Sequence, residues 1–392
     1  MAQTHTPVRQ PEDFLVFGAP QITDAEVDEV VATLRSGWLG TGPKVKAFEA
    51  AMAAYTGTDH AIAVNSCTAA LHLSLMAAGV GPGDEVITTP MTFCATVNSI
   101  IHTGATPVLV DVDPVSFNID AEAVARKLTP ATKAILPVHF AGRSCAMEPL
   151  RDLAQAHDLK IIEDCAHAIE TELDGAKAGT FGDFGCFSFY VTKNVVTGEG
   201  GMITTNDEAL ADRLRVLSLH GMSKDAYKRF GNEGFRHYEV VEPGFKYNMM
   251  DIQAAIGIHQ LERVEANWLR RQEVWALYNE ALAGFGVTLP APDNRDARHA
   301  YHLYTILVDE AVHGVSRDDF LGRMTAHNIG VGVHYLSVPE HPYYQTALGW
   351  NPHDYPNAQR IGQQTVSLPI AANLSDGDVA DVVEAVRQSL AA

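Results

Sequence analysis

The sequence predicts an α/β fold: a mostly parallel seven-stranded sheet with helices on both faces, followed by a smaller C-terminal α+β domain. Between residues 60 and 207, short runs rich in Val and Ile alternate with helical patterns, which is typical of such a sheet. The 392 residues also exceed what one hydrophobic core usually organises. We therefore expect a large domain at 15–250 and a small domain at 251–392, linked by a long helix that starts near residue 250.

The elements of the large domain follow in order along the chain. The expected strands are seven short apolar runs at 60–65, 85–90, 107–113, 134–140, 160–167, 184–190 and 201–207. The helical patterns between them occupy 66–79, 92–104, 120–128 and 146–158. The second of these patterns could also form a strand, because it is rich in Thr and Val.

After Gly244 the alternation of short apolar runs and helical patterns ends. Residues 249–282 contain no proline, and apolar residues recur there at steps of three or four from Ile252 to Trp268, so we expect one long amphipathic helix or two in succession. The remainder predicts a strand at 302–310 and helices at 316–330 and 376–390. These elements would form the small α+β domain.

Charge and cysteine usage exclude several classes of protein. Asp and Glu number 48 against 28 Lys and Arg, so the net charge of −20 repels nucleic acids and anionic membranes. The five cysteines are widely spaced without a C-x-x-C pair, which argues against a disulfide framework or zinc site and favours the cytoplasm. The first residues do not resemble a signal peptide, and no apolar run is long enough for a membrane span. With H-E-x-x-H also missing, we predict no metal.

Ligands of open α/β sheets bind outside the carboxyl ends of the strands, so the residues at those ends are the candidates. Ser66, Cys67 and Thr68 lie between a strand and a helix, where backbone N–H groups and the helix dipole suit a phosphate. The alternative is an ordinary helix N-cap. Phe93 follows another strand end, where its ring would cover a flat cofactor or simply pack against its neighbours.

A pair of acids ends the run at 160–167. Glu163 and Asp164 lie at the end of the short run that starts at Lys160, and His167 comes three residues after Asp164. An acid at this place could hold a cationic heterocycle or bind a metal. The alternative is a carboxylate that caps the next turn.

Lys193 stands in the most unusual segment of the sequence. It follows an apolar strand and precedes Gly198, Gly200 and Gly201. Most lysines are solvated, but one held between a buried strand and a glycine-rich turn can lose water and have its pKa lowered, as an amine that forms a Schiff base requires. Ser188, five residues earlier, is a further phosphate donor. Neither a G-x-G-x-x-G nor a P-loop motif supports a nucleotide-binding alternative.

Together these residues resemble the fold-type I pyridoxal phosphate (PLP) aminotransferases, specifically the nucleotide-sugar aminotransferases of the DegT/StrS group. The resemblance covers nearly the whole chain, in motifs that occur in the family's order: SGWLGTGPKVKAFE, HAIAVNSCTAALHL, GDEVITTPMTFCATVNSI, GATPVLVDVD, ILPVHFAG, IIEDCAHAIE, SFYVTKNVVTGEGG and GFKYNMMDIQAAIG.

The resemblance implies roles for the residues at the strand ends. Lys193 would form the Schiff base with PLP, and Asp164 would pair with the pyridinium nitrogen. His167 would lie beside the ring and Phe93 would stack on it. The phosphate would be held by three residues: Cys67, Thr68 and Ser188. Two positions depart from the family, since Cys67 stands where Gly or Ala is more frequent and Tyr190 stands where many members have His.

The resemblance also implies a homodimer with shared active sites. In the family, the segment that matches GFKYNMMD reaches the cofactor phosphate of the neighbouring subunit, so Lys246 or Asn248 would make that contact. Trp38 in GWLGTGP, together with His334 and Tyr335, lies in segments that match the family's, and these three residues are candidate sugar or nucleotide contacts.

The implied reaction is transfer of an amino group, with L-glutamate as donor, to a nucleotide-linked keto sugar, which gives an amino sugar and 2-oxoglutarate. The sequences of the motifs are most similar to those of family members that aminate C4 of a 4-keto sugar, such as those that make 4-amino-4-deoxy-L-arabinose. Alternatives are amination of a 3-keto sugar or a cyclitol, and, in other classes, a non-catalytic PLP-binding sensor or a metal-dependent hydrolase. Lys193 argues against the sugar-dehydrating relatives, which carry His at its position.

Overall fold

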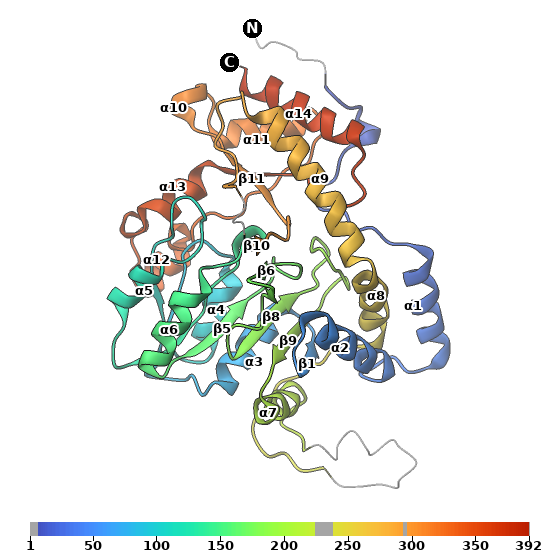
Figure 1. Cartoon of the computed structure of the whole chain (residues 1–392), viewed down its shortest axis with the longest axis vertical. Coiled ribbons are helices and arrows are strands. Elements are labelled where there is room, and N and C mark those ends of the chain that lie inside the picture. The colour runs from blue at the N-terminus through green and yellow to red at the C-terminus, as the bar shows by residue number, and fades with distance from the viewer. Residues whose placement is uncertain (1–6, 224–237, 293–295, 392) are drawn as a thin grey trace.

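A seven-stranded sheet forms the centre of the molecule in the computed structural model, which describes residues 7–223, 238–292 and 296–391 (Figure 1). Each of the seven apolar runs contributes one strand: β1 (His60–Val64), β2 (Glu85–Thr88), β3 (Thr106–Leu109), β4 (Thr132–Ile135), β5 (Lys160–Asp164), β8 (Phe184–Ser188) and β9 (Gly201–Thr205). Their order is β1-β9-β8-β5-β4-β2-β3. All neighbouring pairs are parallel except those of β9, which is antiparallel to both β1 and β8, so the prediction of a mostly parallel sheet is confirmed.

Helices cover both faces of this sheet. Ile62 and Ile162 point to the face covered by α3 (Cys67–Ala77) and α7 (Glu208–Ser218). Their sequence neighbours point to the other face, because side chains alternate along a strand. That face is covered by α2 (Pro43–Thr56) and α8 (Asp251–Glu262) beside β1, and by α5 (Ala121–Lys127) and α6 (Met147–His157) farther along. The ambiguous segment at 92–104 forms a helix, α4 (Cys94–His102).

The proline-free segment forms two helices in succession. The first, α8, ends before Arg263 and packs against α2 and α1 (Asp24–Ser36), whereas α9 (Val264–Leu282) continues into the C-terminal part of the chain. Asp251, the first residue of α8, accepts hydrogen bonds from the backbone N–H groups of Gly42, Lys44 and Val45 (2.8–3.1 Å) and so caps α2.

A second hydrophobic cluster lies at the C-terminal end of the molecule. It contains Val274 and Tyr278 of α9 and residues of the antiparallel pair β11 (Tyr304–Leu307) and β12 (Thr365–Leu368). Helices α11 (Arg317–Ala326) and α14 (Asp376–Leu390) also contribute to this cluster. The short helix α10 (Glu310–His313) follows β11, whereas α12 (Pro342–Leu348) and α13 (Pro356–Gln364) pack in separate clusters that include Val97 and Phe140, respectively. The strand and both helices expected in this region are present as β11, α11 and α14. The division of the chain at residue 250 stays a prediction.

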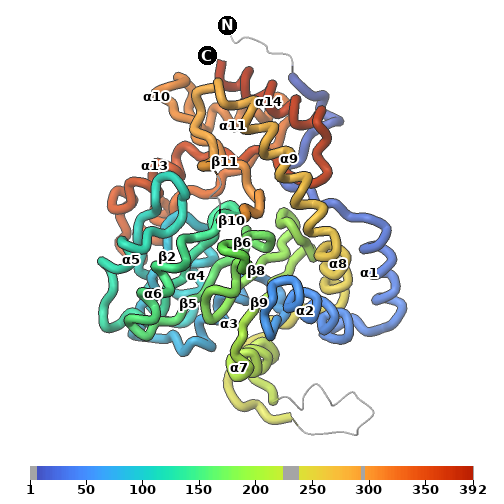
Figure 2. The backbone as a smooth tube through the Cα atoms, in the orientation of Figure 1, coloured from blue at the N-terminus to red at the C-terminus, as the bar shows by residue number. Residues whose placement is uncertain are grey.

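The N-terminal segment belongs spatially to this C-terminal cluster. Figure 2 shows it running beside α14 before it reaches α1. Arg9 forms ion pairs with Asp378 and Asp381 of α14 (2.7 and 2.8 Å), and Leu15 packs against the cluster. The first six residues of the segment considered for a signal peptide lie outside the described residues.

Small elements complete the fold. A three-stranded sheet contains β10 (Ala297–Arg298), β6 (Glu172–Leu173) and β7 (Ala176–Lys177), in that order. Short 3-10 helices are η1 (Pro11–Asp13), η2 (Phe140–Gly142), η4 (Val338–Glu340) and η5 (Pro352–Asp354). None of the helices in the described part of the chain has the length and apolar character that a membrane span requires.

Candidate active site

Lys193 lies just after β8, on the edge of the sheet where the parallel strands end. Its side chain is partly buried, and loss of water lowers the pKa of its amine from 10.5 to about 8. Cys67 and Asp164 lie close enough to oppose this shift through their charges. The sequence-based expectation of a desolvated lysine with a lowered pKa therefore matches the environment of Lys193.

Asp164 ends β5, and its carboxylate is buried. It accepts hydrogen bonds from the hydroxyl of Thr96 (2.8 Å) and from the backbone N–H of Ala166 (3.1 Å). Burial raises the pKa of Asp164, and these two donors and the charge of Lys193 act against that rise. Thr96 was not among the predicted site residues, although it lies on α4 three residues after Phe93.

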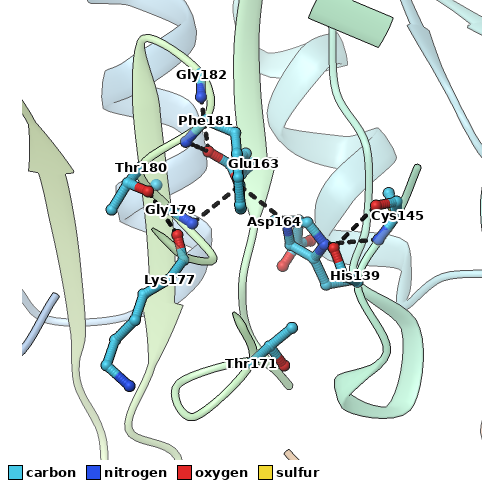
Figure 3. Close-up of polar contacts among 12 residues, drawn as sticks. His139, Cys145, Glu163, Asp164, Thr171, Lys177, Gly179, Thr180, Phe181 and Gly182 are labelled. Atoms are coloured by element: carbon cyan, nitrogen blue, oxygen red, sulfur yellow. Dashed lines mark hydrogen bonds and ion pairs between the residues drawn. The ribbon is translucent and has the colours of Figure 1, made fainter. Parts of the chain in front are cut away.

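The neighbouring acid, Glu163, faces a different environment (Figure 3). Its two oxygens accept hydrogen bonds from the backbone N–H groups of Gly179, Phe181 and Gly182 (2.8–2.9 Å), and His139 Nε2 lies 2.9 Å from Oε2. Glu163 therefore caps a turn, which was the alternative reading for an acid at this strand end. Adjacent residues of a strand point to opposite faces, so Asp164 alone is directed to the site.

Glu163, His139 and Cys165 also lie close enough together to hold a metal ion. However, His139 Nδ1 accepts the backbone N–H of Cys145 (3.1 Å) and Nε2 faces the Glu163 carboxylate. A metal would have to replace hydrogen bonds that already satisfy these buried groups, so we assign the cluster to stabilisation of the loop.

The N-terminus of α3 forms the turn for which the sequence predicts anion binding. Ser66 caps the helix, since its hydroxyl accepts the N–H of Ala69 (3.1 Å), so the ordinary N-cap reading is also correct. Cys67 and Thr68 occupy the first turn, where backbone N–H groups have no acceptor within the helix. The Cys67 thiol points away toward the carbonyl of Cys186 (3.5 Å) and leaves those groups free.

A glycine allows this turn to approach the sheet closely. A Cβ atom at Gly201, the first residue of β9, would lie 2.5 Å from the carbonyl carbon and oxygen of Ser66. Ser188 ends β8 and pairs with Gly201 in the sheet, which brings the predicted phosphate donor to the same turn.

Three aromatic residues contact one another near Lys193 and Asp164. His167 and Tyr335 stack nearly parallel, with 16° between their planes, and Tyr335 Oη lies 3.0 Å from His167 Nε2. Phe93 lies beside Tyr335, with 5.8 Å between ring centroids, and 57% of its side chain is exposed. The structure thus brings Phe93, His167 and Tyr335 together around Lys193 and Asp164.

His334 also belongs to this group. Its Nδ1 lies 2.8 Å from the Ser367 hydroxyl and its ring stacks on Phe17. Burial and the charge of Lys193 lower the pKa of His334 to about 3. Lys193 has the same influence on His302, a residue that the sequence did not single out.

The remaining candidates form a separate group beside the end of β1. The indole N–H of Trp38 donates to the carbonyl of Thr41 (3.2 Å), and the amide of Asn248 donates to the hydroxyl of Thr41 (2.7 Å). Lys246 is exposed, and its carbonyl accepts a hydrogen bond from Asn65 (3.5 Å). The contacts of these three residues therefore do not join them to the group around Lys193 within one chain.

Known proteins share the sequence and the fold of this chain. A model of the DegT/DnrJ/EryC1/StrS aminotransferase family matches residues 20–387. The spore coat polysaccharide biosynthesis protein SpsC of Bacillus subtilis is 50% identical over 97% of this chain and 98% of its own length.

Among solved structures, the putative sugar aminotransferase Spr1654 of Streptococcus pneumoniae superposes with a TM-score of 0.88 at 34% identity, over 96% of this chain and 98% of that one. It has been solved in PLP and PMP forms as well. PseC of Helicobacter pylori, an aminotransferase involved in the biosynthesis of pseudoaminic acid, has a TM-score of 0.89 at 28% identity, over 96% of this chain and 99% of that one.

Proposed function

Because the chain belongs to the DegT/DnrJ/EryC1/StrS aminotransferase family, we propose that it aminates a nucleotide-linked keto sugar. It is a PLP-dependent sugar aminotransferase with a fold-type I architecture. The observation that carries the proposal is the placement of an amine with a lowered pKa, Lys193, beside the buried carboxylate of Asp164. This pairing is what covalent attachment and activation of PLP require.

The residues present fit the cofactor. The first turn of α3 offers N–H groups and a helix dipole to a phosphate, and Gly201 keeps the space beside that turn free of a side chain. The Asp164 carboxylate matches a protonated ring nitrogen, and Phe93 and His167 offer aromatic faces near it. When bound, PLP would supply an electron-poor ring conjugated with the substrate nitrogen, which stabilises negative charge on the carbon attached to that nitrogen.

The side chains of this chain supply the proton transfers. Lys193 would take up at Nζ the proton that leaves the amino-acid Cα and would give it up again on the cofactor side of the substrate nitrogen, and its lowered pKa keeps a useful fraction of the amine unprotonated near neutral pH. Thr96 and Ala166 donate hydrogen bonds to the Asp164 carboxylate and so favour its charged form against burial, which raises its pKa; in that form it would pair with a protonated ring nitrogen. The same steps in reverse carry the amino group to the sugar.

For the substrates, we propose L-glutamate as donor and a 4-keto nucleotide sugar as acceptor, which give 2-oxoglutarate and a 4-amino sugar. The motifs GFKYNMMDIQAAIG and SGWLGTGPKVKAFE support the 4-keto choice by their similarity to 4-aminating members. The names of SpsC and PseC, which refer to polysaccharide and pseudoaminic acid biosynthesis, support a sugar acceptor. A 3-keto sugar or a cyclitol is the second candidate. Trp38, His334 and Tyr335 are the proposed sugar or nucleotide contacts.

We further propose a homodimer whose active sites are shared. Phe93 and Tyr190 are 57% and 45% exposed at the site, and a partner chain that covers them would also exclude water. In this arrangement Lys246 or Asn248 of one chain approaches the phosphate bound by Cys67, Thr68 and Ser188 of the other. The five unpaired cysteines support a reducing compartment, the cytoplasm.

The test combines cofactor chemistry with a substrate panel. Purified protein loaded with PLP should be yellow, and borohydride should fix the cofactor to the peptide that carries Lys193. Lys193→Ala should abolish this incorporation, whereas Lys133→Ala, at an exposed lysine on β4, should not. Incubation with L-glutamate and UDP-, dTDP- and GDP-linked 4-keto and 3-keto sugars, and with a keto-cyclitol, would identify the acceptor by mass. Amination of none of them would contradict the proposal.

A further inference from the structure

Two threonine hydroxyls form a buried chain that ends at Asp164. Thr92 Oγ1 lies 2.7 Å from Thr96 Oγ1, and Thr96 Oγ1 donates to Asp164 Oδ2 (2.8 Å). The three residues are 2%, 1% and 4% exposed, so water has little access to these bonds. The other carboxylate oxygen, Oδ1, accepts the backbone N–H of Ala166 (3.1 Å). Each oxygen of Asp164 therefore has a donor, and the donor of Oδ2 has a hydroxyl partner of its own.

The direction of each hydrogen bond in this chain follows from the chemistry of the groups. A charged carboxylate can only accept, so Thr96 must donate its single hydroxyl hydrogen to Asp164. Thr96 then has only lone pairs left for Thr92, which must be the donor between the two threonines. Both hydroxyl hydrogens thus point toward Asp164, and each bond polarises the next in the sense that favours the negative charge.

The orientation of the Thr96 hydroxyl differs from that of other hydroxyls in helices of this chain. Such hydroxyls usually turn back to a carbonyl three or four residues earlier, as do those of Thr33, Thr56, Ser99 and Thr325 (2.8–3.0 Å). For Thr96 the carbonyl three residues earlier is that of Phe93, which accepts its backbone N–H (3.1 Å). The Thr96 hydroxyl is instead directed to a strand, and in this orientation the Thr92 hydroxyl bonds its lone pair.

The same turn carries a further residue of the site. Phe93 lies between Thr92 and the first residue of α4, and its ring is beside that of Tyr335. Because the hydroxyls on either side of Phe93 bond each other and then Asp164, they tie the first turn of α4 to the end of β5. The two threonines therefore connect the aromatic ring and the acid of the site.

We propose that Thr92 is a positioning residue that acts through Thr96 to hold Asp164 in the charged form and the orientation that pair with a protonated ring nitrogen. This rests on the proposed function, because the ring is that of PLP. Burial raises the pKa of Asp164, and the Thr96 hydroxyl opposes this rise more than the Ala166 N–H or the charges of Lys193 and His139 do. Without the Thr92 donor, the Thr96 hydroxyl is free to turn to a local carbonyl, and Asp164 loses part of that support.

Substitutions that keep the shape of the side chain separate this role from packing. Thr92→Val removes the hydroxyl donor, Thr92→Ser keeps it, and Thr96→Val removes the bond to Asp164 itself. Thr88→Val is the matched control: Thr88 is equally buried, but its hydroxyl donates to the carbonyl of Leu136 (2.8 Å). If Thr92→Val does not fold, as judged by circular dichroism, Thr92→Ala removes the same hydroxyl without adding a methyl group.

The first measurement is the pKa of the Asp164 carboxyl in the protein without cofactor. NMR of protein labelled with ¹³C in its aspartate carboxyl groups gives this pKa, and the signal that disappears in Asp164→Asn is assigned to Asp164. We expect the pKa to rise by about one unit in Thr96→Val, the size of one hydrogen bond to a charged group, and by about half a unit in Thr92→Val. Thr92→Ser and Thr88→Val should match the wild type. An unchanged or lowered pKa in Thr92→Val would overturn the proposal.

The second measurement compares the binding of two ligands by absorbance titration. One is PLP and the other is an analogue of PLP that has carbon in place of the ring nitrogen. Only PLP offers Asp164 a nitrogen, so Thr92→Val should weaken PLP binding about threefold, which corresponds to half a pKa unit, and leave binding of the analogue unchanged. Equal losses for the two ligands would mean that Thr92 only supports the fold of this turn, and would overturn the proposal.

A double-mutant cycle tests whether Thr92 acts through Thr96. If it does, the protein with both Thr92→Val and Thr96→Val should bind PLP no more weakly than Thr96→Val alone. Additive losses would contradict this path. A failure of the proposed function would be recognised separately: PLP would then bind to none of the proteins, the wild type included, whereas the pKa of Asp164 without cofactor would still respond to Thr92→Val.

Discussion

The lowered pKa of Lys193 gives a quantitative prediction about the protein without cofactor. With a pKa of about 8, about one amine in eleven is unprotonated at pH 7, whereas an ordinary lysine with a pKa of 10.5 has only about one in three thousand. Lys193 should therefore react with an acylating reagent about 300-fold faster at pH 7 than an otherwise equivalent lysine of ordinary pKa.

Pulse acylation between pH 6 and pH 11 measures this difference, with exposed Lys133 of β4 as an internal reference. Labelling of Lys193 should increase with pH and reach half its maximum at about pH 8. Asp164→Asn removes a negative charge that favours the ammonium form, so the midpoint should move below that of the wild type. The substitution preserves side-chain volume and an acceptor for Thr96.

Two results would refute this reasoning. A midpoint at or above pH 10 would show that Lys193 is not desolvated as the structure indicates. An upward shift in Asp164→Asn would show that the Asp164 charge does not act on the amine. Circular dichroism of both proteins at each pH would exclude unfolding as the reason for either result.

Three further substitutions test other contacts. Arg271→Leu leaves the buried carboxylate of Glu170 unpaired and should cost about 3–5 kcal/mol in urea unfolding, and replacing both residues by Leu should recover most of this loss. Thr96→Val removes a donor to Asp164, which should raise the pKa of that carboxyl and weaken PLP binding about tenfold in an absorbance titration. Gly201→Ala forces a Cβ against the residue that caps α3, so it should weaken PLP binding more than binding of pyridoxal, which lacks the phosphate. Equal losses for the two ligands would contradict the assignment of that turn to the phosphate.

Much of the scaffold could be predicted from local sequence patterns. Short apolar runs predicted every strand of the central sheet, because a strand that is buried on both faces consists mainly of apolar residues. The carboxyl ends of those strands also indicated Asp164 and Lys193, since neighbouring parallel strands end on the same side. The apolar pattern could not show which of Glu163 and Asp164 is directed to the active site, because this depends on which face of β5 each side chain occupies.

The wall of the site depends on contacts between distant parts of the chain. His302 precedes β11, and the N–H groups of His302 and Leu303 bond the carbonyl of Ala141 (3.3 Å), which holds His302 beside Asn194. Nothing local in the sequence marks that pairing. Asn194 directly follows Lys193 in the sequence, but its hydrogen bond to Glu170, which lies more than twenty residues away, could not be predicted from the local pattern. Such residues become visible only with a tertiary structure.

Because Glu163 and Asp164 point to opposite faces of β5, insertions and deletions within this strand should not be compatible with activity. Gaining or losing one codon within β5 would exchange the two faces, so that one carboxylate would leave the turn at 179–182 without its acceptor while the other left the active site. Because β4 and β8 hold β5 on both sides, the strand cannot rotate to compensate. Length variation compatible with activity should therefore avoid β5, and designed insertions should be placed in the connection before Lys160.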